Sequence, residues 1–281
     1  DLLPVDKWIL SKVNTLAKDV TENMDKYELG IAVQKVYDFI WDEFCDWYVE
    51  TAKYRIYHKE EEKAAADCVL WVLKTVLKQA LKLLHPFMPF ITEEIYSVLV
   101  PEEESLMMSE WPQFHAEWDF PAEENVMEHV KEITRGIRNM RAEMNVPNNR
   151  KTKVYVVCED TEICDGISTL ENSIKPLMMA EKILVQQTKE NIADNAVSVV
   201  VPDAVVYLPL EDLVDFEQEM ERLQKEEEKL KKEIKRAEGM LSNERFISKA
   251  PEAKVQEERE KLEKYTQMLQ QVQERMAGLK K

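Results

Sequence analysis

Apolar side chains recur at alternating steps of three and four residues through the C-terminal part of the chain. One run spans 216–241, with Glu227 as the one position in it that a charge fills, and a second run spans 255–279. This spacing is typical of the a and d positions of a coiled coil. Pro251 lies between the runs, where it can begin a helix but cannot continue one. The pattern predicts that residues 211–281 form an antiparallel helical hairpin, on the order of 40 Å long, that projects from a globular body.

A single helix as polar as either run would be marginal in water. Two legs joined by a short connection bury one another's apolar stripe, so the hairpin is favoured over one long helix. The alternative is an ordinary coiled coil, in which the arm dimerises with a second chain.

Helical periodicity also fills the first 84 residues. Apolar residues lie on one face of the segment 2–24 and on one face of 64–84. Over 28–57 they form two neighbouring stripes. We therefore expect this middle helix to be buried on most of its girth and to be central to a bundle.

Two prolines in His85–Phe90 end the third of these helices. A fourth helix is expected next, and its apolar positions are Ile91, Ile95 and Leu99. Residues 100–121 contain two tryptophans and are interpreted as an ordered crossing loop. Together these segments predict an up-and-down helical bundle over 1–121.

The period of the pattern changes after residue 144. Residues 122–144 still predict a helix, with apolar residues inward and cations on the other face, at Lys131, Arg135, Arg138 and Arg141. Beyond it, a helix is expected at 167–179, and β-branched residues predict strands. The expected strands are 153–158, 182–186, 196–201 and 204–208. The fold class predicted is mainly α: a helical bundle, a small α+β module over 122–210 and a C-terminal antiparallel coiled-coil hairpin.

Composition excludes several classes of function. The 281 residues are 44% hydrophobic and 33% charged, which suits a soluble, helix-rich protein. Only five glycines occur, and neither GxGxxG nor GxxxxGK[ST] is present, so glycine-rich phosphate loops are nearly excluded. The apolar runs are too short to span a membrane, and residues 1–7 carry no secretory signal. The missing initiator Met indicates a piece of something longer, and we expect a cytoplasmic protein.

The net charge of −17 argues against a non-specific nucleic-acid binder, because affinity for phosphate comes from Lys and Arg. The charge is unevenly distributed, however. Residues 211–281 hold 16 basic and 18 acidic side chains, whereas 1–210 hold 22 and 37. Within the first leg of the hairpin, residues 229–236 contain five cations and one anion. Such a patch can bind a polyanion selectively, because the rest of the surface repels it.

The four cysteines show no metal-binding pattern. They are Cys45, Cys68, Cys158 and Cys164; no pair has CxxC spacing, and no histidine flanks them at zinc-finger spacing. We expect reduced, buried thiols and no metal site.

No group of side chains makes a convincing catalytic site. Asp42 and Asp46 are four residues apart on the central helix, as an acid/base pair would be, but solvated surface charge is the simpler interpretation. His85 precedes Pro86 at a helix end, where capping or packing is favoured over catalysis. A self-contained enzyme that uses one of these three side chains is one hypothesis.

The central helix carries more aromatic residues than one helix readily buries. They are Phe39, Trp41, Phe44, Trp47 and Tyr48. Most such clusters belong to a core. Unpaired RNA bases also stack on such rings, so an RNA contact by one of them is the competing interpretation.

Four stretches, in the order in which they occur, resemble valyl-tRNA synthetases of the bacterial type. Residues 37–50 (YDFIWDEFCDWYVE) resemble their anticodon-binding helical domain, and 85–96 (HPFMPFITEEIY) resemble the same domain in the class I synthetases for branched aliphatic amino acids. Residues 137–147 resemble the segment that follows. Residues 241–251, with LSNERF and KAP, resemble the tip of the C-terminal arm. The resemblance covers essentially the whole chain, and no HIGH-like or KMSKS-like motif occurs.

The resemblance implies a division of labour on tRNA. The bundle approaches the anticodon stem and loop, and the arm reaches the outer corner of the L-shaped tRNA, where the D and T loops meet. The parent enzyme ligates valine to its tRNA using ATP and Mg²⁺. This fragment lacks the catalytic half, so we expect it neither to activate valine nor to bind ATP or another cofactor. The expected partners are valine tRNA and the missing catalytic and editing domains of the same chain, in a monomer without membrane contact.

The candidate tRNA contacts are cations and aromatic residues in three places, and no catalytic residue or metal ligand is assigned. In the bundle they are Lys35, Phe39, Trp41, Phe44, Trp47, Lys53 and Arg55. At the junction they are Arg135, Arg138 and Arg141. On the arm they are Lys231, Lys232, Lys235, Arg236, Arg245 and Lys249. The alternative function is a coiled-coil module that binds protein and no RNA.

Overall fold

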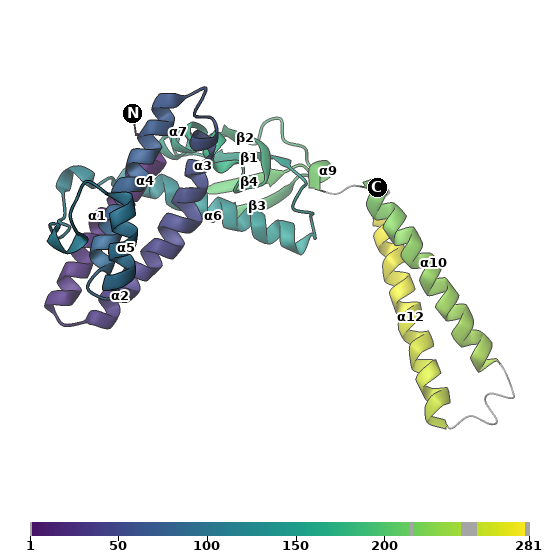
Figure 1. The fold of residues 1–281 in the computed structure, drawn as a ribbon. Helices are drawn as coiled ribbons and strands as arrows, with labels where there is room; N and C mark the ends of the chain where they lie inside the picture. Colours follow the sequence, from purple (N-terminus) through teal and green to yellow (C-terminus); the bar gives the residue numbers. More distant parts are fainter. Residues whose placement is uncertain (1, 214–215, 243–251, 279–281) are drawn as a thin grey trace. The chain divides into compact units, whose positions relative to one another are not determined.

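The computed structural model describes residues 2–213, 216–242 and 252–278, without the side chains of 216–222, 252–253 and 274–278. The chain forms two units, an N-terminal unit (Asp1–Leu213) and an arm (Val214–Lys281), each described by itself. Helices dominate both units, and one four-stranded sheet lies in the first (Figure 1). The predicted fold class, mainly α with a small α+β part, is therefore confirmed.

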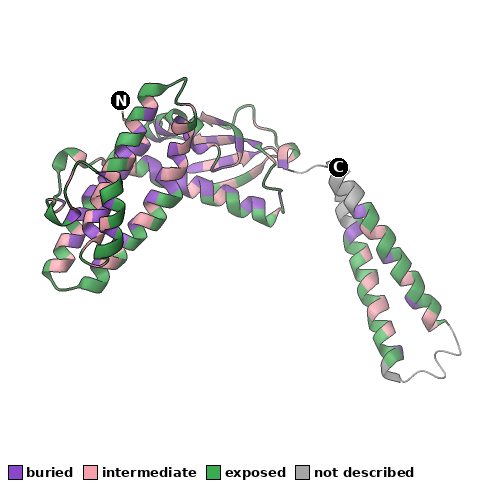
Figure 2. Ribbon diagram, viewed as in Figure 1, coloured by how far each residue is buried: buried purple, intermediate pink, exposed green. Residues whose placement is uncertain are grey.

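Helices occur where the apolar pattern predicted them, in the bundle and at 122–144. They are α1 (Pro4–Asp25), α2 (Leu29–Asp38), α3 (Glu50–Tyr57), α4 (Lys63–Leu84), α5 (Pro89–Leu99) and α6 (Pro121–Glu143). Helix α1 is the centre of the bundle, because it contacts α2, α4 and α6. Its predicted inner face, including Trp8, Ile9 and Val13, is almost completely buried. The purple inner faces in Figure 2 show this common core.

The expected helix over 28–57 is continuous, but its middle is not α-helical. Residues Phe39–Val49 form a π-helix between α2 and α3. Residues five apart come close together in a π-helix, because its hydrogen bonds join i to i+5. This places Phe39 and Phe44 inside together, beside Trp47 and Tyr48. The sequence pattern did not reveal this change, since aromatic residues in two stripes also fit an α-helix.

Helix α5 is where the predicted bundle face is wrong. Ile91 and Ile95 are 49% and 39% exposed, whereas Thr92 and Tyr96 are buried. The contacts of α5 are with α4 and with the 3₁₀ turn Leu106–Met108, so one narrow face is covered. The polar residue Thr92 belongs inside because its hydroxyl donates to the Met88 carbonyl and contacts the His85 ring.

The crossing loop over 100–121 is held against α1, as expected of an ordered loop. It contains two 3₁₀ turns, Leu106–Met108 and Ala116–Trp118. The Trp111 indole donates to the Thr21 hydroxyl at 2.8 Å. Asn14 donates to the His115 carbonyl and accepts from the His115 backbone N–H.

The predicted strands are confirmed and form one mixed sheet. They are β1 (Thr152–Cys158), β2 (Ala180–Gln186), β3 (Val197–Val201) and β4 (Ala204–Leu208), in the order β2-β1-β4-β3. Strands β1 and β2 are parallel, and the other pairs are antiparallel. Between β1 and β2, the helix expected at 167–179 is wrong. The structure has α7 (Thr161–Thr169), which Asp160 caps through the N–H groups of Glu162 and Ile163, and the short α8 (Glu171–Ile174).

Helix α6 joins the bundle to the sheet, since it contacts α1 on one side and α7 and β3 on the other. Gly136 permits the approach to β3. A Cβ added there would lie 2.6 Å from Cγ1 of Val199. The division at residue 121 between bundle and α+β module stays a prediction.

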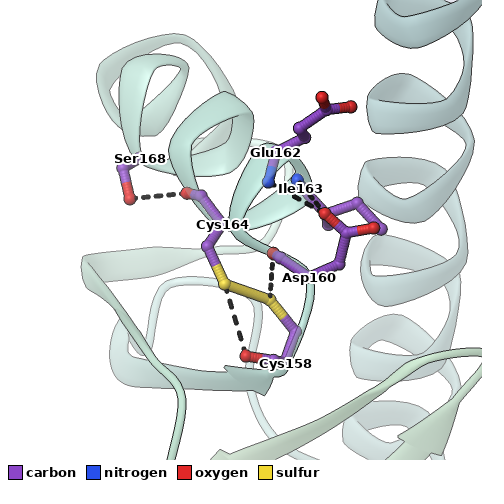
Figure 3. Close-up of a disulfide and its surroundings, with 6 residues drawn as sticks. All are labelled: Cys158, Asp160, Glu162, Ile163, Cys164 and Ser168. Carbon is purple, nitrogen blue, oxygen red and sulfur yellow. Dashed lines mark hydrogen bonds between the residues drawn. A yellow bond between two sulfur atoms is a disulfide. The ribbon is translucent and has the colours of Figure 1, made fainter.

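The cysteines depart from the expectation of reduced, buried thiols. Cys158, at the end of β1, and Cys164, in α7, are paired as a disulfide with their Cα atoms 6.6 Å apart (Figure 3). Cys45 is exposed and Cys68 is partly buried. Sequence spacing did not predict the pair, because only the short turn at Asp160 brings α7 back beside β1.

The arm consists of two helices that pack on one another, α10 (Phe216–Leu241) and α12 (Glu252–Gly278). Leu223, Leu230 and Val272 form its buried core, against which Tyr265 and Leu269 pack. Glu227, the charged seam position, accepts a hydrogen bond from the Gln273 amide of the opposite leg at 2.8 Å. The seam is thus buried within one chain, which favours the hairpin over the dimer. The predicted seam positions Phe216, Met220, Met276 and Leu279 lie outside the described side chains.

Within the described parts of the chain, no helix is both long enough and apolar enough to cross a membrane.

Candidate nucleic-acid interface

Arg55 belongs to a buried polar cluster and not to a surface. Its guanidinium donates two hydrogen bonds to Asp6, at 2.7 and 2.6 Å, and the Tyr48 hydroxyl donates to the same carboxylate at 2.7 Å. The three side chains are at most 3% exposed. Burial raises the pKa of Tyr48, and the charge of Asp6 raises it further. This cluster joins α1 to the π-helix and α3, so Arg55 does not reach a bound RNA in this conformation.

The aromatic candidates of the bundle include both buried and exposed rings. Phe39, Phe44 and Trp47 are 5–8% exposed, whereas Trp41 is 57% exposed. Tyr37 precedes Trp41 by one turn and is 58% exposed. Among the aromatic candidates, Trp41 is therefore the ring that a base could reach, and Tyr37 is a neighbour that the sequence reasoning did not single out.

The surface around Trp41 is acidic. Asp38, Asp42 and Asp46 are all exposed on the same stretch of helix. Carboxylates repel phosphates, so this surface suits stacking of a base more than contact with an RNA backbone. Among the described residues, the Asp42 and Asp46 side chains make no hydrogen bond or ion pair, which is what solvated surface charges predict.

His85 has a structural environment. Its Nδ1 lies 2.8 Å from the Thr92 hydroxyl, across the turn between α4 and α5. The ring also lines a groove of about 280 Å³ with Phe90 and Met107, and Glu93 and Glu94 line it too. Apolar side chains beside two carboxylates do not make a site for a polyanion.

The two bundle lysines are already paired at the surface. Lys35 lies 2.7 Å from Asp19, and Lys53 lies 2.6 Å from Glu50. Exposed pairs of this kind contribute at most about 1 kcal/mol, so an RNA phosphate could compete for either lysine.

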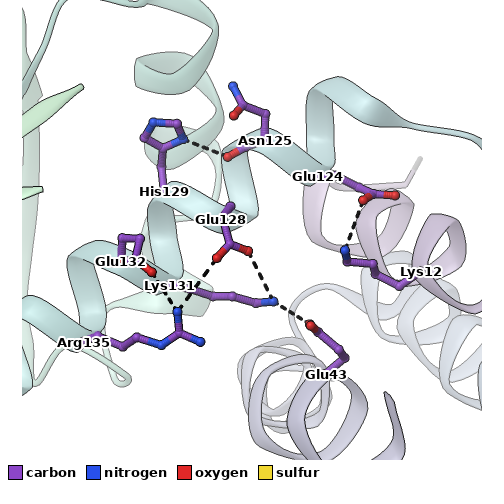
Figure 4. A network of polar contacts seen from close by, with 9 residues as sticks. All are labelled: Lys12, Glu43, Glu124, Asn125, Glu128, His129, Lys131, Glu132 and Arg135. Atoms are coloured by element: carbon purple, nitrogen blue, oxygen red, sulfur yellow. Dashed lines mark hydrogen bonds and ion pairs between the residues drawn. The ribbon is translucent and has the colours of Figure 1, made fainter. Parts of the chain in front are cut away.

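The cations of α6 have different surroundings: in Figure 4, Lys131 reaches Glu43, whereas Arg135 lies beside Glu132 and Glu128. Lys131, expected on the outer face, is 3% exposed; its ammonium lies 2.5 Å from Glu43 and 4.8 Å from the centre of the Trp8 ring. Arg135 is half exposed and pairs with Glu132 at 2.8 Å. The predicted cationic face is therefore wrong for Lys131, which links α6 to the π-helix.

The remaining junction arginines hold the fold together. The Arg138 Nε donates to the Leu177 carbonyl at 3.2 Å, although the side chain is exposed. Arg141 is 3% exposed and donates to the carbonyls of Pro147 and Arg150. Burial lowers the pKa of Arg141. The expectation that Arg141 lies on an outer face is therefore wrong, and the three junction candidates do not form one surface.

The arm carries its cations differently. Positions two residues beyond the α10 seam lie about 200° around the helix and so face away from α12. Four cations occupy them and form the outer stripe: Lys225, Lys229, Lys232 and Arg236. All four are exposed, and they span roughly 16 Å of the helix axis. Lys231 and Lys235 lie beside the outer stripe and are also exposed.

The cations near the outer stripe are lightly paired. Lys231 lies 2.7 Å from Glu227, and Arg236 lies 3.9 Å from Glu233. Within the residues that the structure describes, Lys229, Lys232 and Lys235 have no ion-pair partner. The candidates Arg245 and Lys249 lie outside the described residues. Sequence reasoning left Lys225 and Lys229 out of the candidate list, although a two-residue offset from the seam identifies both.

No metal centre is apparent: in the described ranges, no three His, Cys, Asp or Glu side chains gather where they could hold an ion.

Two family models match this chain. Residues 6–156 match the anticodon-binding domain of tRNA ligase, and residues 215–280 match the valyl tRNA synthetase tRNA binding arm. The first match covers α1 to β1 and the second covers the helical hairpin.

Curated relatives agree with these matches. The chain is 50% identical over 274 residues to the valine–tRNA ligase of Clostridium perfringens and 48% identical over 278 residues to that of Clostridium tetani. It is 39% identical over 278 residues to the valine–tRNA ligase of Bacillus subtilis. In each case 98% of this chain is covered but 31% of the relative, so the chain spans about a third of their length.

Proposed function

Since the chain belongs to the valyl-tRNA synthetase family, with its anticodon-binding domain and its tRNA-binding arm, we propose that the two units divide one tRNA between them. The bundle contacts the anticodon stem and loop. The arm contacts the outer corner of the molecule, where the D and T loops meet. The tRNA bound is the one for valine.

The observation that carries this proposal is the outer stripe of α10. Its cations are exposed, face away from the seam and follow one line along the helix. Cations in a line contact successive phosphates of a backbone and position it without reading its sequence. A net charge of −17 on the chain as a whole confines such contacts to places like this one.

The bundle offers different chemistry. Trp41 presents an exposed ring among carboxylates, which favours a stacked base over a phosphate. Lys35 and Lys53 are exposed enough to exchange their carboxylate partners for phosphates. A single-stranded loop, with its bases turned outward, fits such a surface better than a duplex does.

Ligation of valine to tRNA is proposed for the whole protein of which these residues are a part. ATP and Mg²⁺ would act in a separate catalytic portion of that protein, and editing would take place outside these residues as well. The residues of this chain hold the tRNA. The protein acts as a monomer in the cytoplasm. The alternative, a coiled-coil module that binds protein alone, finds no support in either family match.

The direct test titrates the chain with valine tRNA and with an unrelated tRNA at two salt concentrations. We expect valine tRNA to bind more tightly, and both affinities to fall as salt rises. Absence of binding to both tRNAs at low salt would contradict the proposal for these residues.

The contribution of the arm is tested by changing Lys231, Lys232, Lys235 and Arg236 to Glu. We expect affinity to fall by about 10- to 100-fold, and the slope of log affinity against log salt to lose about 0.7–0.9 for each phosphate contact removed. The control carries the same charge change on the other leg: Lys254, Arg259, Lys261 and Lys264 changed to Glu. Equal losses in both variants would mean that net charge, and not the α10 surface, governs binding.

A further inference from the structure

Among the described residues of the N-terminal unit, no long helix packs on one face of the four-stranded sheet. Helix α7 packs on β1 and β2, and α6 packs on β3. Alternate residues of β1, beginning with Thr152, are buried on that side. The intervening residues of β1 lie on the opposite side, the open face. We define this open face by Lys153, Tyr155 and Val157 of β1 together with Lys182, Leu184 and Tyr207, which the register pairs with Lys153 and Tyr155.

The register gathers similar side chains on the open face. Lys153 of β1 is paired with Lys182 of β2, and both are exposed. Tyr155 of β1 is paired with Tyr207 of β4, and both are partly exposed. Directly paired side chains have Cβ atoms about 5 Å apart, so the two tyrosines leave the sheet side by side, as do the two lysines.

A third cation reaches this face from the loop after β2. The Lys189 ammonium lies 5.1 Å from the centre of the Tyr207 ring. The ammonium therefore lies over the ring of Tyr207, in a place that a stacking base would take over. Among the described residues, none of the three ammonium groups of Lys153, Lys182 and Lys189 is paired with a carboxylate. The three cations therefore give this face a local positive charge in a chain with 55 acidic and 38 basic side chains.

We propose that the open face binds unpaired nucleotides of RNA, with bases stacked on Tyr155 and Tyr207 and phosphates held by Lys153, Lys182 and Lys189. Aromatic rings on a sheet with lysines beside them supply the two interactions that single-stranded RNA uses, which are stacking and charge. The three uncompensated cations favour RNA over a second protein surface. The inference rests on the proposed function in that the ligand is RNA, but it adds a contact separate from the bundle and the arm.

The test compares substitutions that keep or remove the rings. Changing Tyr155 and Tyr207 to Val removes stacking but keeps residues that suit a strand, whereas changing both to Phe keeps the rings. With an unmodified transcript of valine tRNA as the probe, we expect the Val variant to bind at least about fivefold more weakly and the Phe variant to bind as the parent does. Circular dichroism of each variant checks that the sheet has formed.

A second measurement does not depend on substitutions. Ultraviolet crosslinking of the same transcript to the unaltered chain, followed by peptide mapping, should mark peptides that contain Tyr155 or Tyr207. Equal affinity of the Val variant and the parent, without crosslinks to these peptides, would overturn the inference and leave the open face to a protein partner. If the arm variant described above still loses affinity, the proposed function stands and only the open face is lost. If the unaltered chain binds no tRNA, both fail.

Discussion

The N-terminal unit and the arm use similar cations for different purposes. In the unit, Arg55, Lys131 and Arg141 are each 3% exposed and bind carboxylates or carbonyl groups of the fold. On the arm, the cations of the outer stripe are exposed. The N-terminal unit has a core in which long charged side chains can be buried when they are paired. Two packed helices bury only a seam, so their other faces remain available to a ligand.

The comparison shows that residue type alone does not identify an RNA contact. Of the seven RNA contacts proposed in the bundle from the sequence, four are buried: Phe39, Phe44, Trp47 and Arg55. The described candidates on the arm are all exposed. Geometry explains this contrast: the heptad fixes which face of α10 is inward, whereas a helix with two apolar stripes leaves its outer face undetermined.

The largest expected effect is the loss of the buried ion pair. Changing Arg55 to Met leaves the Asp6 carboxylate buried without its cation, which costs about 3–5 kcal/mol of unfolding free energy. All six tryptophans lie in the N-terminal unit, so urea unfolding followed by tryptophan fluorescence reports on this unit. Changing Lys53 to Met, at an exposed pair, is the control and should cost less than about 1 kcal/mol. Similar midpoints for the two variants would contradict the structural role of Arg55.

The next two effects concern glycines in long helices, Gly136 in α6 of the N-terminal unit and Gly239 in α10 of the arm. Changing Gly136 to Ala puts a Cβ 2.6 Å from Val199, and we expect a loss of about 1–3 kcal/mol despite the better helix propensity of Ala. The measurement is the same fluorescence-detected unfolding. A gain in stability would show that α6 can move away from the sheet.

The corresponding change on the arm should act in the opposite direction. Gly239 of α10 has open space around it, so Gly239→Ala should stabilise the helix by about 0.5–1 kcal/mol. The N-terminal unit has the tryptophans, so the arm is followed instead by the thermal change in far-ultraviolet circular dichroism. A loss of helix in this variant would contradict the account of Gly239 as an exposed helical position.

An effect of similar, small size is expected at the exposed ring of the bundle. Trp41→Ala should weaken binding of valine tRNA about fivefold if one base stacks there. Trp71, on α4, is 52% exposed, close to the 57% of Trp41, and Trp71→Ala is the matched control. Equal affinities of the two variants would remove Trp41 from the interface.

Helical periodicity predicted the long helices and the arm because burial follows the helix period directly, and β-branched residues predicted the strands. It failed at α5, where Ile91 and Ile95 are apolar but exposed, and at Lys131 and Arg141, where long cations are buried with partners from other elements. These partners, such as Glu43 for Lys131, are distant in sequence. The disulfide between Cys158 and Cys164 depends likewise on a turn that spacing does not reveal.

The candidate site was predictable in part for the same reason. The seam of the arm identifies its outer stripe, and the charge count identifies its basic segment. Which aromatic residue of the helix over 28–57 is exposed depends on the π-helix at Phe39–Val49, which shifts the faces of the residues within it. The open face of the sheet depends on strand order, since only the register places Tyr155 beside Tyr207.

The most direct test of the division of labour is a nuclease footprint of valine tRNA bound to this chain, compared with the variant in which Lys231, Lys232, Lys235 and Arg236 are Glu. We expect the unaltered chain to protect both the anticodon stem and loop and the outer corner of the tRNA. In the variant, protection of the corner should be lost while protection of the anticodon stem and loop remains at saturating protein. Loss of both protections together, or protection of the corner that survives the four substitutions, would contradict the account.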